Sequence, residues 1–118
     1  MKQSIFLLTM ISAFMCFSFL TAIHSTTTID PNNRFELGKN KHGKFKVQLK
    51  NLSNQKIKIY HAPIDGGSHS PQVVTPNQQV TVKVEANTAL YIENPSNDTV
   101  TVKLKVTGDL GLSMGYQK

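Results

Sequence analysis

The sequence predicts an all-β protein, a small antiparallel β-sandwich of about seven strands, on the basis of three observations. Apolar residues alternate with polar ones at a period of two in several short runs, as expected for strands that bury one face. Threonine, valine and isoleucine dominate these runs and favour sheets. Beyond the first two dozen residues, no segment shows helical spacing. We expect an immunoglobulin-like or jelly-roll arrangement, or alternatively a five-stranded barrel of the oligonucleotide/oligosaccharide-binding (OB) type.

The amino-terminal segment has the layout of an export signal. Lys2 is followed by an uncharged, mostly apolar run from Ile5 to Ile23. Residues 1–25 are therefore expected to be a signal peptide, cleaved after Ala22 or after Ser25. The alternative is an uncleaved membrane anchor, and either interpretation exports the rest of the chain.

Export without disulfides favours a bacterial compartment. Cys16 is the only cysteine and lies within the signal, so the exported part has no thiol to cross-link. Exported domains of this size in the animal extracellular space usually carry disulfides. We expect a periplasmic, cell-surface or secreted bacterial protein. Residues 26–33, polar and rich in threonine, are expected to form a flexible leader, and residues 34–118 a single β-sandwich domain.

The first strands are predicted around a polar turn. Phe45, Val47 and Leu49 alternate with lysines, and a second alternating run contains Ile57. Because the stretch 51–55 between them is rich in turn formers, we expect an antiparallel hairpin with Leu49 opposite Ile57.

The next elements are a loop and four further strand runs. Residues 61–72 hold two prolines and two glycines and are expected to form a loop that could carry contacts. The strand runs that follow are 80–84, 90–92, 100–106 and 110–116.

A weak internal repeat supports two similar turns. The segment 47–59 maps onto 90–102 with an offset of 43 residues and no gap. Asn51 then aligns with Asn94, and Ser53 with Ser96. Asparagine and serine bond readily to nearby backbone groups, so shared turn chemistry in two hairpins explains the match better than duplication does.

Positive charge gathers in one part of the sequence. Residues 30–60 hold eight lysines and arginines against two acidic residues, whereas residues 61–118 hold four against five. In the expected hairpin, cationic side chains share the solvent face with one aromatic ring. The candidate binding residues are Lys44, Lys46, Lys50, Lys56, Lys58 and Tyr60.

An anionic partner fits this predicted face, whether an acidic polysaccharide, a lipid headgroup or an acidic protein. Nucleic acid is disfavoured, because the exported part has a single arginine, Arg34, no tryptophan and few aromatics for base stacking. The alternative role of the lysines is solubility and protection of exposed strands from aggregation.

The sequence supports neither catalysis nor a resident metal or cofactor. Ser113 lies in a literal G-x-S-x-G, but five residues follow it and none is an acid or a histidine. His61, Asp65 and His69 could approach one ion, although their spacing matches no established metal site.

These observations predict a non-enzymatic binding or adhesion module at the cell envelope or surface. The alternative is a self-assembling structural subunit, in which the last strand run, 110–116, pairs with another copy. The membrane is expected as a partner only through the amino-terminal segment.

Overall fold

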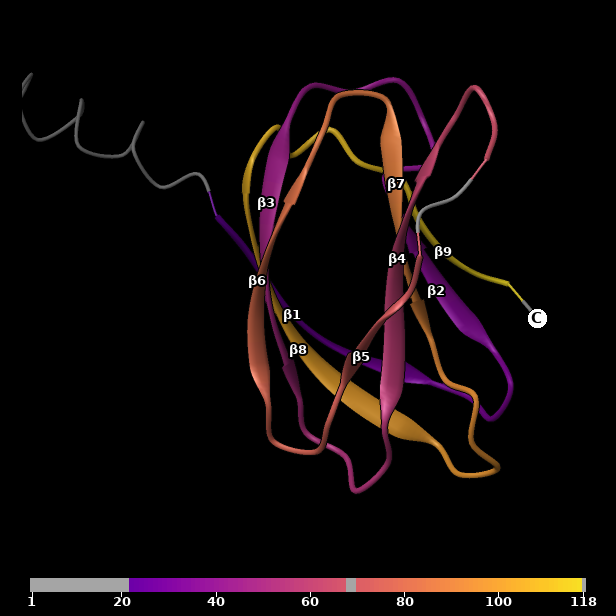
Figure 1. Cartoon of the computed structure of the whole chain (residues 1–118). Helices are drawn as coiled ribbons and strands as arrows, with labels where there is room; N and C mark the ends of the chain where they lie inside the picture. The colour runs from indigo at the N-terminus through magenta and orange to yellow at the C-terminus, as the bar shows by residue number, and fades with distance from the viewer. Residues whose placement is uncertain (1–21, 68–69, 118) are drawn as a thin grey trace, which may run out of the picture.

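A computed structural model describes residues 22–67 and 70–117, which form nine strands in two antiparallel sheets. Figure 1 shows the two sheets stacked face to face. The strands are β1 (Ile23–Ile29), β2 (Arg34–Leu37), β3 (Phe45–Asn51), β4 (Ile57–Pro63), β5 (Gln72–Val74), β6 (Gln79–Val84), β7 (Thr88–Glu93), β8 (Val100–Gly108) and β9 (Met114–Gln117). The described residues include no helix that is long and apolar enough to cross a membrane.

The strand order identifies the sandwich as a jelly roll. The four-stranded sheet has the order β1-β8-β3-β6 and the five-stranded sheet the order β5-β4-β7-β2-β9. The first strand pairs with the eighth, the second with the seventh, the third with the sixth and the fourth with the fifth. This nested pairing is that of two Greek keys. An immunoglobulin domain instead places its first strand beside its second.

The predicted β-sandwich is therefore confirmed, in its jelly-roll form. β9 is added beside β2, and the described residues form nine strands where the sequence predicted about seven. The five-stranded barrel was wrong, because the strands form two separate sheets.

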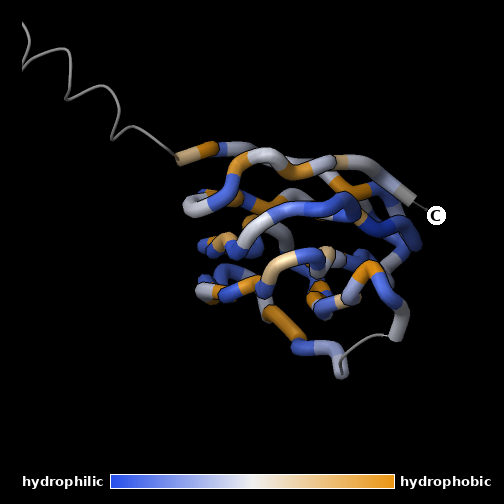
Figure 2. Tube along the Cα trace, turned by 90° about the horizontal axis from the view of Figure 1, so that it is seen from above, coloured by the Kyte–Doolittle hydropathy of each residue, from blue (hydrophilic) through white to orange (hydrophobic). Residues whose placement is uncertain are grey.

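The core lies between the sheets and follows from the alternation in the sequence. Every second residue of β3 and β8 is buried, and the residues between them point to solvent. Figure 2 shows hydrophobic and hydrophilic segments following one another along the strands. Burying one such side chain fully stabilises the fold by roughly 1.5–3 kcal/mol. The fully buried side chains include Ile29, Leu37, Leu49, Ile57, Ile59, Leu90 and Ile92.

The predicted hairpin is wrong, because β3 and β4 lie in different sheets. β3 pairs with β6 and β8, so that Leu49 lies opposite Val80 and Leu104. β4 pairs with β5 and β7, and Ile57 lies opposite Val74. A five-residue connection spans the roughly 10 Å between stacked sheets as readily as the shorter gap between neighbouring strands. Turn composition alone therefore does not separate a hairpin from a corner, and the same error affected β7 and β8.

A buried asparagine shapes the corner between β3 and β4. The Asn51 side chain is fully buried, and its Nδ2 donates to the carbonyls of Gln55 (2.7 Å) and Val74 (3.1 Å). Its Oδ1 accepts from the main-chain N–H (2.9 Å) and the hydroxyl (2.6 Å) of Ser53. One carboxamide thus closes the turn and attaches β5 to it.

The corner between β7 and β8 repeats this arrangement. Asn94, also fully buried, donates through Nδ2 to the carbonyls of Asp98 (2.7 Å), Ile29 (3.1 Å) and Asp30 (3.1 Å). Its Oδ1 accepts from the main-chain N–H (3.0 Å) and the hydroxyl (2.7 Å) of Ser96. The repeat seen in the sequence therefore corresponds to two equivalent corners, each of which holds a third segment.

The expected flexible leader is also corrected. Residues 23–29 form β1, which pairs with β8 along its whole length, from Ile23 opposite Val106 to Ile29 opposite Val100. Thr27 and Ile29 are buried. Threonine is β-branched and suits a strand, but its polar hydroxyl hid the alternation from a hydrophobicity pattern. The part of the predicted signal before residue 22 lies outside the described residues.

Two other boundaries shift. β4 extends through His61 to Pro63, so the loop after it is shorter than predicted. His61 lies opposite Leu90 in the same sheet. The expected last strand, 110–116, is reduced to β9, since its first residues form a connection.

The two corners generate a stability prediction. Replacing Asn94 with alanine leaves buried carbonyl and amide groups without partners, and we expect a loss of about 2–4 kcal/mol in the free energy of unfolding. Asn51→Ala should behave alike, because its contacts are equivalent. Urea denaturation measures both losses.

The matched control is Asn54→Ala, an exposed residue of the β3–β4 corner. It should change the free energy of unfolding by less than about 0.5 kcal/mol. Equal effects at Asn54 and Asn51 would contradict the role given to the buried carboxamide.

Candidate functional site

The structure divides the predicted binding residues between the two faces of the sandwich. Lys46 and Lys50 point outward from β3 in the four-stranded sheet. Lys58 and Tyr60 point outward from β4 in the five-stranded sheet. The expected single basic hairpin does not exist, because its two strands belong to opposite layers.

The other two predicted residues lie just outside the strands. Lys44 precedes β3, is exposed, and forms an ion pair of 3.6 Å with the exposed Glu85. Lys56 precedes β4 and is exposed at the corner. Neither contributes to a shared face with Lys58.

A larger basic face is assembled instead on the outer side of the four-stranded sheet. β8 and β6 add lysines to those of β3. Within the residues that the structure describes, no outward position of the four strands carries a carboxylate. We call this surface the lysine face; its cations are Lys46, Lys50, Lys83, Lys103 and Lys105.

Like charges lie directly opposite one another on the lysine face. Lys50 of β3 is the partner of Lys103 of β8, and Lys46 of β3 is the partner of Lys83 of β6. Directly opposed like charges destabilise a sheet by up to about 1 kcal/mol per pair. The fold tolerates two such pairs at different points of β3, and no outward position of these strands carries a carboxylate in the described structure.

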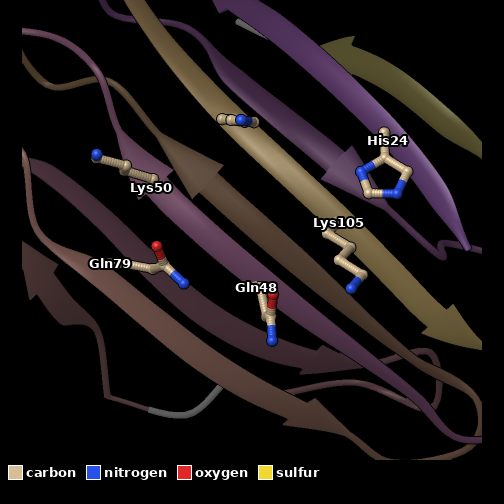
Figure 3. A pocket seen from close by; sticks show the side chains of 6 residues that line it. His24, Gln48, Lys50, Gln79 and Lys105 are labelled. Carbon is tan, nitrogen blue, oxygen red and sulfur yellow. The ribbon is translucent and has the colours of Figure 1, made fainter.

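The lysine face is hollowed near its centre. An open depression of about 260 Å³ lies there. Figure 3 shows labelled side chains of β1, β3, β6 and β8 standing on one side of the sheet around it. Its lining residues are His24, Gln48, Lys50, Gln79, Lys103 and Lys105.

A second depression, of about 390 Å³, lies at the end of the same face. Lys44, Lys46 and Lys83 line it together with Glu85, the ion-pair partner of Lys44, and the ends of β3, β6 and β8. The lysine face therefore has cationic side chains around two hollows.

The opposite face of the sandwich is electrically balanced. Arg34 stacks over the ring of Tyr91, 4.4 Å from its centroid, and donates to the hydroxyl of Tyr60 at 3.1 Å. Its guanidinium also lies 3.5 Å from the carboxylate of Glu36. Burial raises the pKa of Tyr91, and the neighbouring Glu36 carboxylate raises it further. These contacts form a structural cluster in which the cation lies beside a carboxylate and two aromatic rings.

Lys58 and Tyr60 thus have structural partners. Lys58 lies opposite Glu93 of β7. Tyr60 packs edge-on against Tyr91, with 5.2 Å between ring centroids. Both residues belong to a charge-balanced sheet surface and do not extend the lysine face.

The structure favours neither a catalytic role for Ser113 nor a metal site among the predicted ligands that it describes. Ser113 directly precedes β9, and its main-chain N–H donates to Asn40. A nucleophile elbow requires a helix after the serine, whereas a strand follows here. Among residues 22–67 and 70–117, no group of three or more His, Cys, Asp or Glu side chains is placed to hold a metal ion. His69 of the proposed trio lies outside the described residues.

Three lysines and one histidine of the candidate site were not predicted from the sequence. Lys83, Lys103 and Lys105 occupy outward positions that the alternation had already indicated. His24 belonged to the segment assigned to the signal. The sequence does not indicate which strands share a sheet, because strand partnership depends on contacts between distant segments.

Comparison with known proteins finds no family model that matches the chain and no curated protein of similar sequence.

The opposed lysines make a testable prediction. Replacing Lys103 with glutamine removes the repulsion with Lys50, so we expect the free energy of unfolding to rise by a few tenths to about 1 kcal/mol. High salt should reduce this gain, because ions screen exposed charges. Urea denaturation at two ionic strengths measures the effect.

A double-mutant cycle with Lys50→Gln supplies the control. The two gains should not add, since either substitution alone removes the same repulsion. Lys58→Gln, opposite Glu93, should give no gain. A drop in stability for Lys103→Gln at low salt would contradict the predicted repulsion.

Proposed function

We propose that this protein is an exported, non-enzymatic binding module that holds an anionic partner on the lysine face at the cell envelope or surface. The observation that carries the proposal is the concentration of five lysines, without a carboxylate, on the outward positions of the four-stranded sheet as the structure describes it. Such a field attracts and retains anions.

The position of the lysines argues against simple protection of sheet edges. Lysines that prevent aggregation are useful on edge strands, whose main-chain groups lack partners. Here β3 and β8 are central strands, and they carry four of the five lysines of the face. The edges of this sheet, β1 and β6, carry one lysine between them, Lys83.

The contrast between the two layers supports the same interpretation. Cations on the outer side of the five-stranded sheet lie beside carboxylates, as Arg34 lies beside Glu36 and Lys58 opposite Glu93. A need for solubility alone would be served by mixed charges on both layers.

The partner is defined by the chemistry of lysine. An ammonium group is a point charge without the planar fork of arginine, so recognition is loosely specific. The outward positions of β1, β3, β6 and β8 carry no phenylalanine, tyrosine or tryptophan in the described structure, which disfavours stacking on bases. Acidic polysaccharides, anionic lipid headgroups and acidic proteins remain as partner classes, with nucleic acid disfavoured.

A charge-removal experiment tests the proposal. In the variant Lys50→Gln, Lys103→Gln, Lys105→Gln, we expect binding to polygalacturonate or to phosphatidylglycerol vesicles to fall roughly 100-fold. Each lysine near an anionic surface contributes about 1 kcal/mol, and about 1.4 kcal/mol corresponds to a tenfold change in affinity. Cosedimentation at several salt concentrations measures the affinity.

A variant with equal net charge separates the site from bulk attraction. Lys41→Gln, Lys56→Gln, Lys58→Gln removes three exposed lysines outside the lysine face and should weaken binding less than tenfold. Equal losses in both variants, or wild-type binding unaffected by salt, would overturn the proposed site. Polygalacturonate and vesicles in parallel distinguish a polysaccharide from a lipid partner.

Export has its own test. Cleavage after Ala22 leaves β1 complete, whereas cleavage after Ser25 removes three residues that pair with β8. We therefore expect the mature chain to begin at Ile23. Mass spectrometry and amino-terminal sequencing of protein from a fractionated bacterial host check this prediction.

The control is Leu7→Arg, Leu8→Arg, which interrupts the apolar run and should hold the protein in the cytoplasm. An intact Met1 in soluble cytoplasmic wild-type protein would contradict export.

A further inference from the structure

β9 is an edge strand of four residues that carries neither charge nor proline, two of the usual protections against pairing. In the described part of the chain it has a strand neighbour on one side only, β2. It carries no acidic or basic residue and no proline, and its Met114 and Tyr116 side chains are 46% and 58% exposed. Natural edges are usually blunted by charge, proline or short length.

The other three edges differ in this respect. β5 has three residues and follows Pro71 closely, with Pro76 shortly after it. β6 carries Lys83 at an outward position, and β1 is mostly polar. Among the described edges, β9 is therefore the one on which two large apolar side chains are exposed.

The main-chain groups of Met114 and Tyr116 point away from β2. The N–H of Gly38 donates to the carbonyl of Ser113 at 2.8 Å, which identifies these two residues as a hydrogen-bonded pair. Such pairs alternate along an antiparallel ladder, so the next one is Glu36 with Gly115. The N–H and C=O groups of Met114 and Tyr116 consequently face the open side of β9.

The side chains of Met114 and Tyr116 are exposed because β9 lies at the margin of its sheet. Met114 and Tyr116 share the core side of the sheet with their partners Leu37 and Phe35, and Tyr116 packs edge-on against Phe35 at 5.3 Å. The five-stranded sheet is one strand wider than the sheet that covers it. β9 lies at its margin, where the covering is incomplete.

We propose that β9 pairs with β9 of a second copy of this chain, antiparallel and about a twofold axis at Gly115. This register sets Met114 of each copy opposite Tyr116 of the other, and it satisfies all four open main-chain groups of each strand. The thioether of methionine also packs favourably against an aromatic ring. The two five-stranded sheets become one continuous sheet.

Steric and electrostatic conditions both favour this contact. In this register Gly115 lies opposite Gly115 of the second copy, and a residue without a side chain permits close approach of the two backbones there. A Cβ added there would meet no atom within 4 Å of its own chain, so the outer face of the sheet is uncovered at Gly115. The chain carries a net charge of +6, so copies repel one another except where the surface is uncharged, as β9 is.

The symmetry has a consequence for the lysine face, which rests on the proposed function. A twofold axis between antiparallel neighbouring strands runs perpendicular to the sheet, so both four-stranded sheets lie on the same side of the joined sheet. Two lysine faces then point toward one partner, and bivalent binding strengthens attachment to a polymer or surface. An isologous contact closes with two copies, so it gives a dimer and not an extended layer.

Light scattering over a range of protein concentration tests the dimer directly. Protein purified after expression of the full chain, with its amino terminus determined, should reach twice the mass of one chain. Met114→Pro removes an outward N–H and leaves the β2 ladder intact, since edge strands accept proline there. Met114→Lys places a charge on the edge. Both variants should remain monomeric.

The control is Leu52→Lys, which changes an apolar residue of similar exposure at a corner and should still dimerise. Monomeric wild type at every concentration, or dimers of both Met114 variants, would overturn the proposal.

Binding measurements keep the two proposals separate. Dimer loss should weaken binding to long polygalacturonate about tenfold or more while leaving binding to short galacturonate oligomers unchanged. A dimer that binds no polyanion would contradict the proposed function but not the dimer. Salt-dependent polyanion binding by a strictly monomeric protein would contradict the dimer but not the proposed function.

Discussion

The fold depends on two buried carboxamides, those of Asn51 and Asn94. A jelly roll moves the chain repeatedly from one sheet to the other, and each crossing exposes main-chain groups that must find partners away from the ladders. Each asparagine closes a crossing and also holds a neighbouring one. Asn51 exchanges main-chain bonds with Asn77 and Gln78 before β6, and the main-chain N–H of Asn94 donates to the carbonyl of Asn33 before β2. The two Greek keys are thereby joined at equivalent points.

These corners determine which strands share a layer, and the layer determines the chemistry of its surface. Because the corner at Asn51 sends β4 to the opposite sheet, β3 instead lies beside β8, and Lys50 lies opposite Lys103. Repulsion between the opposed lysines is expected to lower stability, and the proposed binding of an anion uses the same uncompensated charge. A surface that is suboptimal for folding is a common property of binding sites.

Within this scheme, the sandwich separates three tasks. One layer presents the lysine face, the other carries the balanced cluster around Arg34 and Tyr91, and the extra strand β9 extends the balanced layer beyond the first. The proposed association through β9 would leave the lysine face free, because the contact lies at a sheet edge and not on an outer face. The two proposals, anion binding and self-association, are therefore compatible in one small domain.

The sequence by itself determined the all-β class, the inward and outward positions of most strands, and the likeness of the Asn51 and Asn94 turns. These features are local: alternation and turn chemistry act between residues close in the chain. It missed β1, whose buried Thr27 is polar by composition, and it correctly marked Lys46 and Lys50 as outward. Only the tertiary structure decided that Lys103 and Lys83 join them while Lys58 does not. Strand partnership is set by contacts between distant segments and by the choice between a hairpin and a corner, which turn residues alone leave open.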